Sequence, residues 1–185
     1  MSATINSYKT ENQIFQDFIS LANNALAFFS VQGWQVRQLR QVLKVNVLPP
    51  TIFVSIITNK QTGAQYLQTQ KTDDTITETN SSKQEVKIRF SALRKRKITD
   101  ETDTIYGVDV LRLISYYLQS QTGISDLKTL GYAQYRNGLI TNQDFLDDSD
   151  NFEFMPFFEN EFLFTNSWTN SIGEITQFNQ GIYKI

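Results

Sequence analysis

The chain of 185 residues contains no cysteine and no histidine. Without cysteine it has neither a disulfide framework nor a thiol nucleophile. Without histidine it lacks the commonest general base at neutral pH, the commonest metal ligand, and any Ser-His-Asp or Cys-His arrangement. These absences favour a protein that is not an enzyme, and we expect no cofactor and no metal site.

Long apolar runs are missing as well. No segment approaches the roughly 20 residues that span a bilayer, and the first ten residues, MSATINSYKT, lack the charged and apolar regions of a signal peptide. We therefore expect synthesis in a reducing cytoplasm and no membrane partner. Charged residues are 19% of the chain and the formal net charge is −2. A dedicated nucleic-acid binder usually carries a basic excess instead.

Aromatic residues are plentiful at 13%, within a hydrophobic content of 40%. Large rings can therefore build much of the core. No repeat and no linker between two cores is visible. The sequence predicts one α+β domain over residues 10–170, between an N-terminal arm, residues 1–9, and a C-terminal arm, residues 171–185.

Two amphipathic helices are predicted. A capping box over Thr10–Gln13 opens a stretch with apolar residues at helical spacing, which predicts a helix from about Glu11 to Val31, ended by Gly33. A second apolar stripe predicts a helix that begins near Asp103 and is ended by Gly123.

Several segments have the character of strands. Thr51–Thr58 is rich in β-branched residues, and the alternation in Val86–Ala92 is typical of a half-buried strand. Gly131–Ile140 predicts a strand with a turn at Asn137-Gly138, and Trp34–Pro50 a strand and a loop. The polar, Thr-rich stretch between the first two strands predicts a long exposed hairpin or a partly disordered loop.

The stretch NQDFLDDSDNFEFMPFFENEFLF, residues 142–164, combines acidic and aromatic residues. Its aspartates are Asp144, Asp147, Asp148 and Asp150. A calcium loop that starts at Asp144 would need Gly at its sixth position and Glu at its twelfth, where Ser149 and Met155 stand. A carboxylate pair of the glycosidase type stays open, because sequence alone fixes no separation.

The same stretch fits a strand better. From residue 152 to 168 most aromatic residues have even numbers and the glutamates odd ones, so an extended chain places them on opposite faces. Pro156 indicates an edge strand, a bulge, or a strand that starts after it. We expect a strand from about Met155 to Trp168, with an aromatic face toward the core.

The order of these elements resembles the neck or tail-terminator proteins of tailed bacteriophages. The resemblance covers about Ile14 to Trp168 and rests on a strand, loop and helix (EVKIRFSALRKRKITDETDTIYGVDVLRLISYYLQS), an Arg-bearing segment (GYAQYRNGLI), an acidic loop, and a Phe-rich strand. It implies an antiparallel sheet packed on two main helices, with a long hairpin and extended termini (tail-terminator-like).

The resemblance also implies a role: a homo-oligomeric ring, a hexamer, that caps the tail tube, stops its polymerisation and joins it to the head-side connector around a channel for DNA. Expected partners are other copies of the chain, tail tube protein, neck or connector proteins, tail sheath, and genomic DNA in transient non-specific contact. The expected location is the virion neck or tail. Residues of the hairpin that could reach a neighbouring subunit are Tyr66, Thr72, Asp73, Asp74 and Thr77.

One basic cluster consists of Arg94, Lys95, Arg96 and Lys97. Three interpretations stay open: a solvated loop, an ionic contact with a neighbour's acidic loop at Asp144–Asp150, and contact with DNA phosphates in a lumen.

Other functions are not excluded by sequence. The alternatives are a head–tail connector or tail-completion protein of an adjacent neck layer, a carboxylate-dependent glycan hydrolase, and a binding module with exposed aromatic residues.

Overall fold

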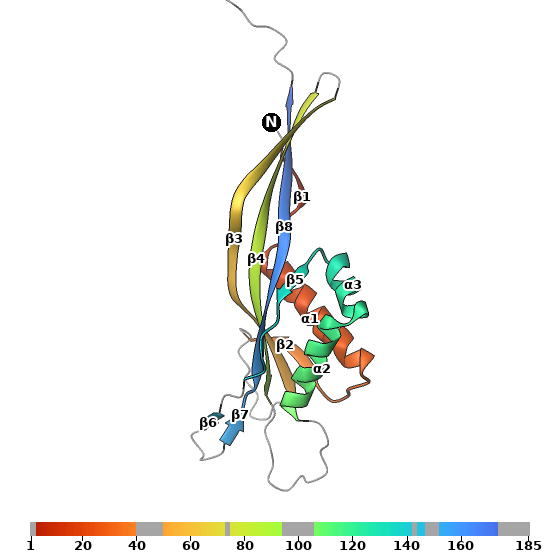
Figure 1. Ribbon diagram of the computed structural model, residues 1–185, viewed down its shortest axis with the longest axis vertical. Helices are drawn as coiled ribbons and strands as arrows, with labels where there is room; N and C mark the ends of the chain where they lie inside the picture. Colours follow the sequence, from red (N-terminus) through yellow and green to blue (C-terminus); the bar gives the residue numbers. More distant parts are fainter. Residues whose placement is uncertain are drawn as a thin grey trace, which may run out of the picture. The chain divides into compact units, whose positions relative to one another are not determined.

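The computed structural model describes residues 3–39, 50–72, 75–93, 106–141, 144–146 and 152–173. Within these ranges the fold is α+β, as predicted, and Figure 1 shows its strands and helices. The elements are β1 Ala3–Ser7, α1 Glu11–Phe28, β2 Gln35–Gln38, β3 Thr51–Thr72, β4 Thr75–Leu93, α2 Gly107–Gln119, α3 Gln121–Thr129, β5 Ala133–Arg136, β6 Asp144–Leu146, β7 Phe152–Phe154 and β8 Phe157–Gly173.

The main sheet has the strand order β1-β8-β4-β3-β2, and β5 also pairs with β8. β6 and β7 form a separate two-stranded sheet. β1 and β5 are antiparallel to β8. The expected antiparallel sheet needs one correction, because β2 runs parallel to β3, with Gln35–Gln38 opposite Thr51–Val54. Parallel strands need a crossover of about a dozen residues, and residues 39–50 provide that length.

The chain divides into two compact units, which we describe separately. The first, called the hairpin sheet, comprises residues 1–8, 62–83 and 165–185, and the second, called the helical unit, comprises residues 9–61 and 84–164. β3, β4 and β8 contribute residues to both units. The domain boundaries inferred from the sequence stay a prediction.

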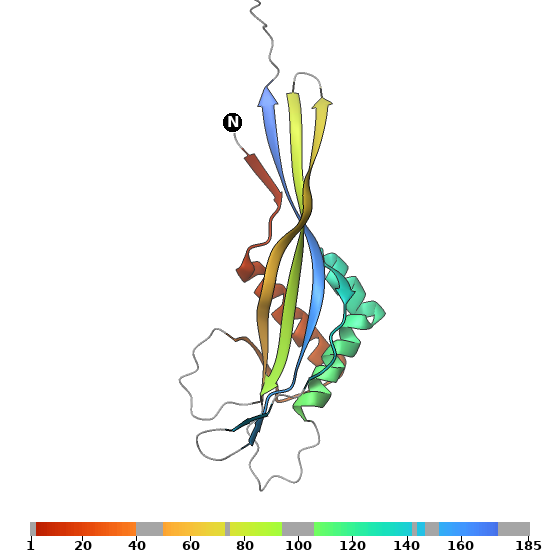
Figure 2. The same cartoon turned by 60° about the vertical axis from the view of Figure 1, so that its left-hand side comes forward.

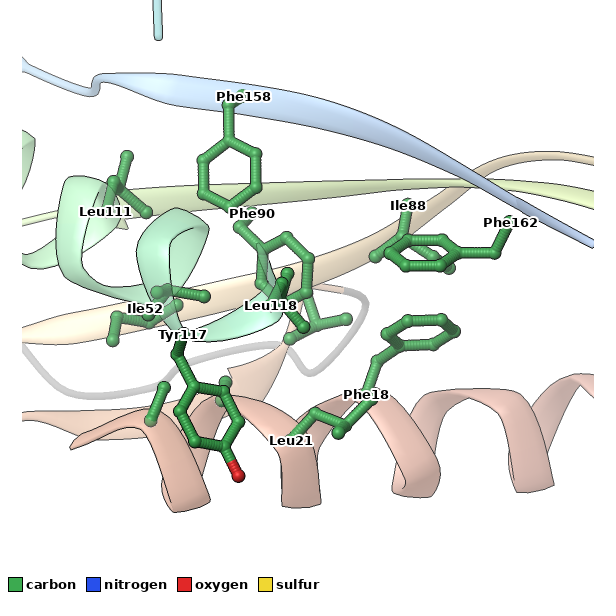
Figure 3. Close-up of a cluster of buried hydrophobic side chains, with 14 of the residues drawn as sticks. Phe18, Leu21, Ile52, Ile88, Phe90, Leu111, Tyr117, Leu118, Phe158 and Phe162 are labelled. Carbon is green, nitrogen blue, oxygen red and sulfur yellow. The ribbon is translucent and has the colours of Figure 1, made fainter. Parts of the chain in front are cut away.

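The hydrophobic core belongs to the helical unit, where the helices cover one face of the sheet (Figure 1). Figure 3 shows the large side chains from α1, α2 and the strands meeting in this layer. Phe18 of α1 lies 4.6 Å from Phe162 of β8 between ring centroids, and Phe90 of β4 stacks on Phe158 at 5.1 Å. Such pairs add about 0.5–1.5 kcal/mol each to what burial of the rings contributes.

The predicted alternation in β4 and β8 is confirmed. Val86, Ile88, Phe90 and Ala92 are fully buried, and so are Phe158 and Phe162. The strand β8 begins one residue after the proline, which is one of the three placements expected for it. At the start of β3, Thr51–Ser55 is buried throughout, as expected for a strand at the centre of the fold.

Helix α1 begins as predicted. The Thr10 side chain accepts a hydrogen bond from the Gln13 backbone N–H at 3.2 Å. The Gln13 side chain donates to Asp17 instead of returning to Thr10, so the capping box is half formed. The helix ends at Phe28, before the predicted end at Val31, and the chain turns away at Ser30, which has a positive φ of 55°.

Helix α2 begins later than predicted. Its first residue is Gly107, after an extended N-cap at Tyr106, whereas the predicted start at Asp103 lies outside the described residues. Leu111 is fully buried, with Val110, Ile114 and Leu118 of the same helix.

The predicted stop at Gly123 is wrong, because α2 ends at Gln119 and a third helix, α3, follows. Ser120 makes the junction: its hydroxyl donates to the Tyr117 carbonyl at 2.7 Å and accepts from the Gly123 N–H at 3.1 Å. A Cβ at Gly123 would lie 2.0 Å from the Tyr117 carbonyl oxygen. This glycine therefore permits close packing of two helices and does not end one.

The predicted turn at Asn137-Gly138 is also wrong. After β5 the chain continues beside β8, and Thr141 and Phe157 exchange two backbone hydrogen bonds of 2.8 Å. A Cβ at Gly138 would lie 2.1 Å from the carbonyl oxygen of Glu159. The glycine is required by this close approach of two backbones.

Candidate functional site

The hairpin sheet consists of β1 and the parts of β3, β4 and β8 in the first unit. None of its described residues belongs to the hydrophobic core cluster. Every residue of β3 from Ile57 to Lys71 is exposed, and Tyr66 and Leu67 are 65% and 55% exposed. Sheets are stable when a hydrophobic face packs against another layer, and the described part of this sheet has no such layer of its own.

Side-chain hydrogen bonds link β8 to both of its neighbours, β1 and β4, in this sheet. The Ser7 hydroxyl donates to the Thr165 carbonyl at 3.4 Å, and the hydroxyls of Thr79 and Thr169 lie 3.3 Å apart. The strand β1 falls within the segment expected to be an N-terminal arm, and it pairs with β8 over Ala3–Ser7.

In the helical unit, charged residues of β4 and β8 alternate with the core residues and form a charge network with β3 and β5. Its members are Lys60, Glu85, Lys87, Arg89, Arg136, Glu159 and Glu161. Arg89 donates to Glu159 Oε1 through Nε at 2.9 Å and Nη2 at 2.5 Å, and lies 4.5 Å from the Phe157 ring centroid. Lys87 bonds Glu161 at 2.9 Å, and Lys60 bonds Glu85 at 3.0 Å.

Within the charge network, Lys87 and Glu161 stabilise each other's ionised form. The ion pair with Lys87 lowers the pKa of Glu161, and the same pair raises the pKa of Lys87. Partial desolvation, and then the carboxylates of Glu161 and Glu85, raise the pKa of the Tyr135 hydroxyl. A general acid of a glycosidase needs a raised carboxyl pKa, so Glu161 has the opposite character.

A second polar cluster surrounds Asp17, which is 6% exposed. Lys9 Nζ lies 2.6 Å from Asp17 Oδ2, and the Tyr132 hydroxyl donates to the same oxygen at 2.9 Å. The Lys9 ammonium also lies 4.4 Å from the Tyr132 ring centroid. Burial, and then the Asp17 carboxylate, raise the pKa of Tyr132. This cluster links the start of α1 to the segment after α3, so we assign it a role in stability.

A groove of about 380 Å³ lies between α2, α3 and β5. Its lining includes Leu118, Ile124, Leu127 and Tyr135, and no aspartate or glutamate. A hydrolase of the carboxylate type would require two facing carboxylates in such a place. Among the described residues, no group of three or more His, Cys, Asp or Glu side chains could hold a metal ion.

Most of the residues proposed from the sequence as contact sites are not placed. Arg94–Lys97, Asp73, Asp74, Asp147, Asp148 and Asp150 lie outside the described residues. Thr72 ends β3 and Asp144 begins β6, and only their backbones are described. Tyr66 and Thr77 are placed, on neighbouring strands of the hairpin, with Tyr66 exposed and Thr77 half-buried.

The sequence analysis missed the charge network and the Asp17 cluster. The glutamates of β8 were assigned to one face, and Glu85, Lys87 and Arg89 alternate with the core residues of β4. These two alternations are the signal that could have predicted the network. Its pairing depends on β8 lying beside β4, and no local pattern reveals that neighbour. Within the part of the chain that the structure describes, no helix is long and apolar enough to cross a membrane.

Comparison with known families gives the class of the protein. Residues 12–174 match the model of a family described as E217 gateway protein gp29, which places the chain among bacteriophage structural proteins of the gateway or neck type. Because the match spans most of the 185 residues, the chain belongs to the E217 gateway protein gp29 family. No protein with a curated description matches the chain.

Family membership confirms the coarser part of the sequence-based resemblance, that of a phage neck protein. It indicates a structural role rather than a catalytic one and a virion-associated location.

Proposed function

We propose that the chain is the subunit of a homo-oligomeric ring in the neck of a tailed phage, a hexamer in the simplest form. The ring caps the tail tube, stops its polymerisation and joins it to the head-side connector. Genomic DNA passes through its centre. Tail tube protein, neck or connector proteins and tail sheath are the proposed partners.

The observation that carries this proposal is the exposure of β3 in the hairpin sheet. Every residue from Thr62 to Lys71 is exposed, and among the described residues β4 flanks this part of β3 on one side only, so its outer edge is available to a strand of another chain. In a ring, heterologous contacts between neighbouring subunits cover such surfaces. Family membership supports the neck as the place where this happens.

The charge network suits a surface that lines or neighbours a DNA channel. Its cations Lys87 and Arg89 are bound to glutamates, so they attract phosphates less than free cations would. Weak, non-specific attraction is compatible with rapid passage. The basic segment Arg94–Lys97 and the acidic segment Asp144–Asp150 are proposed as contacts between subunits.

The test is the mass of the purified full-length protein in solution, alone and with candidate tail tube protein. A ring of six, or a ring that appears only with the tube, would support the proposal. A protein that stays monomeric at high concentration and ignores the tube would overturn it.

A second candidate is a head–tail connector or tail-completion protein of an adjacent neck layer. The family description, gateway, favours this candidate over a strict terminator. A ring that binds connector protein and leaves the length of tubes polymerised in vitro unchanged would identify it. A ring that shortens those tubes would identify the terminator.

A further inference from the structure

The hairpin sheet has two outer strands, β1 and β3. Its order is β1-β8-β4-β3, and the pairing of β2 with β3 ends at Val54, within the other unit. Among the described residues, β8 is the only strand beside β1, and β4 is the only strand beside β3 from Thr62 to Thr72, so each has one open side. Each of these edges presents a row of backbone N–H and C=O groups to a further strand.

Apart from Lys71, neither edge has the charges or prolines that usually protect edge strands, although β1 is only five residues long and its register with β8 shifts between Ile5 and Ser7. Monomeric proteins place charges or prolines on edge strands. The five residues Ala3–Ser7 include no charged residue and no proline, and the segment Thr62–Thr72 includes one charge, at Lys71, and no proline. The composition of both edges therefore favours pairing with another strand.

The strand directions define which strand fits. Figure 2 shows β8 running opposite to β4, and β4 opposite to β3, while β1 is antiparallel to β8. Because directions alternate over an even number of strands, β1 and β3 run in opposite senses. A second copy in the same orientation therefore presents a β1 that is antiparallel to β3 of the first.

We propose that β1 of one subunit pairs antiparallel with β3 of the next subunit, within Thr62–Thr72. The hairpin sheets of successive copies then join into one continuous sheet around the ring. This inference rests on the proposed ring, and it names the contact that builds it. The contact is heterologous, because each copy uses β1 toward one neighbour and β3 toward the other. Such contacts form a ring when the rotation between neighbouring copies closes.

A pairing of β3 with β3, or of β1 with β1, would give a different assembly. Each is an isologous contact about a two-fold axis, so the two copies would face opposite ways. A cyclic ring that joins a tube on one face to a connector on the other needs all copies in one orientation. The pairing of β1 with β3 alone satisfies this requirement for the hairpin sheet.

Cysteine pairs test the contact without background, because the natural chain has no cysteine. Ser7→Cys is combined with a single cysteine at each position from Ala64 to Gln70 in turn. A scan is needed because a shift of one residue moves each side chain to the other face. A disulfide forms only where the Cβ atoms come within about 3.5–4.5 Å. The matched control combines Ser7→Cys with Asn12→Cys on the exposed side of α1.

Mild oxidation of the full-length variants is followed by denaturing electrophoresis, and the native mass is measured beside it. We expect a ladder of covalent dimers, trimers and larger species up to the ring mass from at least one β1–β3 pair. The control pair and the single-cysteine variants should stay monomeric under denaturation.

Three outcomes separate the two proposals. A ring of full native mass that gives no ladder with any pair overturns the β1–β3 contact and leaves the ring intact. Covalent dimers from a single cysteine in β3 show a two-fold contact, which also overturns it. A chain that is monomeric in native mass overturns the proposed function itself.

Discussion

Replacing Tyr132 by phenylalanine tests the Asp17 cluster by removing one oxygen. The Tyr132 side chain is 2% exposed, and its hydroxyl is the only part that phenylalanine lacks. The ring contacts remain, with centroids 5.0 Å from Phe18 and 5.5 Å from Phe164. The only interaction that the substitution removes is therefore the 2.9 Å hydrogen bond from the Tyr132 hydroxyl to Asp17.

A hydrogen bond to a charged group contributes about 1.5–3 kcal/mol. Asp17 keeps Lys9 as a partner at 2.6 Å, so its carboxylate is not left unpaired, and the lower end of that range applies. We expect Tyr132→Phe to lower the free energy of unfolding by about 1.5 kcal/mol. For a chain of this length that corresponds to a fall in Tm of roughly 3–6 °C.

The measurement is equilibrium unfolding in urea, at a protein concentration where wild type and variant have the same mass, because assembly adds to apparent stability. Tyr66→Phe is the matched control, since Tyr66 is 65% exposed, and it should change the free energy by less than about 0.5 kcal/mol. A change below that limit for Tyr132→Phe as well would refute the reasoning. Lys9 and Gln13 would then suffice for Asp17.

Three further predictions concern pH, packing and assembly. The pKa of Tyr132 is raised in the folded state, so the folded chain keeps a proton that the unfolded chain releases above about pH 10. The free energy of unfolding should therefore fall as pH rises past 10, by up to about 1.4 kcal/mol per pH unit for this group. Tyr132→Phe should flatten the plot of the urea-derived free energy of unfolding against pH. Gly123→Ala places a Cβ against the Tyr117 carbonyl and should cost about 1–3 kcal/mol; an unchanged melting curve would contradict the close approach. Neutralising Arg94–Lys97 with glutamines should leave the melting temperature unchanged but reduce ring assembly or particle yield, whereas full yield and infectivity would indicate a merely solvated loop.

Short-range patterns account for what the sequence analysis predicted correctly. Alternation placed Val86–Ala92 and Phe158–Phe164 as strands with one face in the core, and helical spacing with Thr10 as a cap placed α1. The junction of α2 and α3 was missed, because a glycine in sequence looks the same whether it ends a helix or permits close packing. Gly123 is needed because the Tyr117 carbonyl lies where a Cβ would stand, and this contact exists only in the folded chain.

The candidate site was less predictable, because it depends on which strands become neighbours. Odd-numbered charges such as Lys87 and Glu161 could be assigned to a face, but their pairing requires β8 beside β4. The exposure of Tyr66 was predictable from the polar, Thr-rich segment around it. The open edge of β3 was not, because it follows from β2 pairing no further than Val54.

The two open edges of the hairpin sheet have a consequence for how rings would grow. An open arc of any number of subunits joined through β1 and β3 still has one free β1 and one free β3. Adding a subunit therefore leaves the number of free edges unchanged. Only the last contact removes both, and it forms between two ends held on the same assembly, at a high effective concentration. Closed rings should therefore outnumber open arcs even when each single contact is weak, and a native mass spectrum should show monomer and complete ring with few species between.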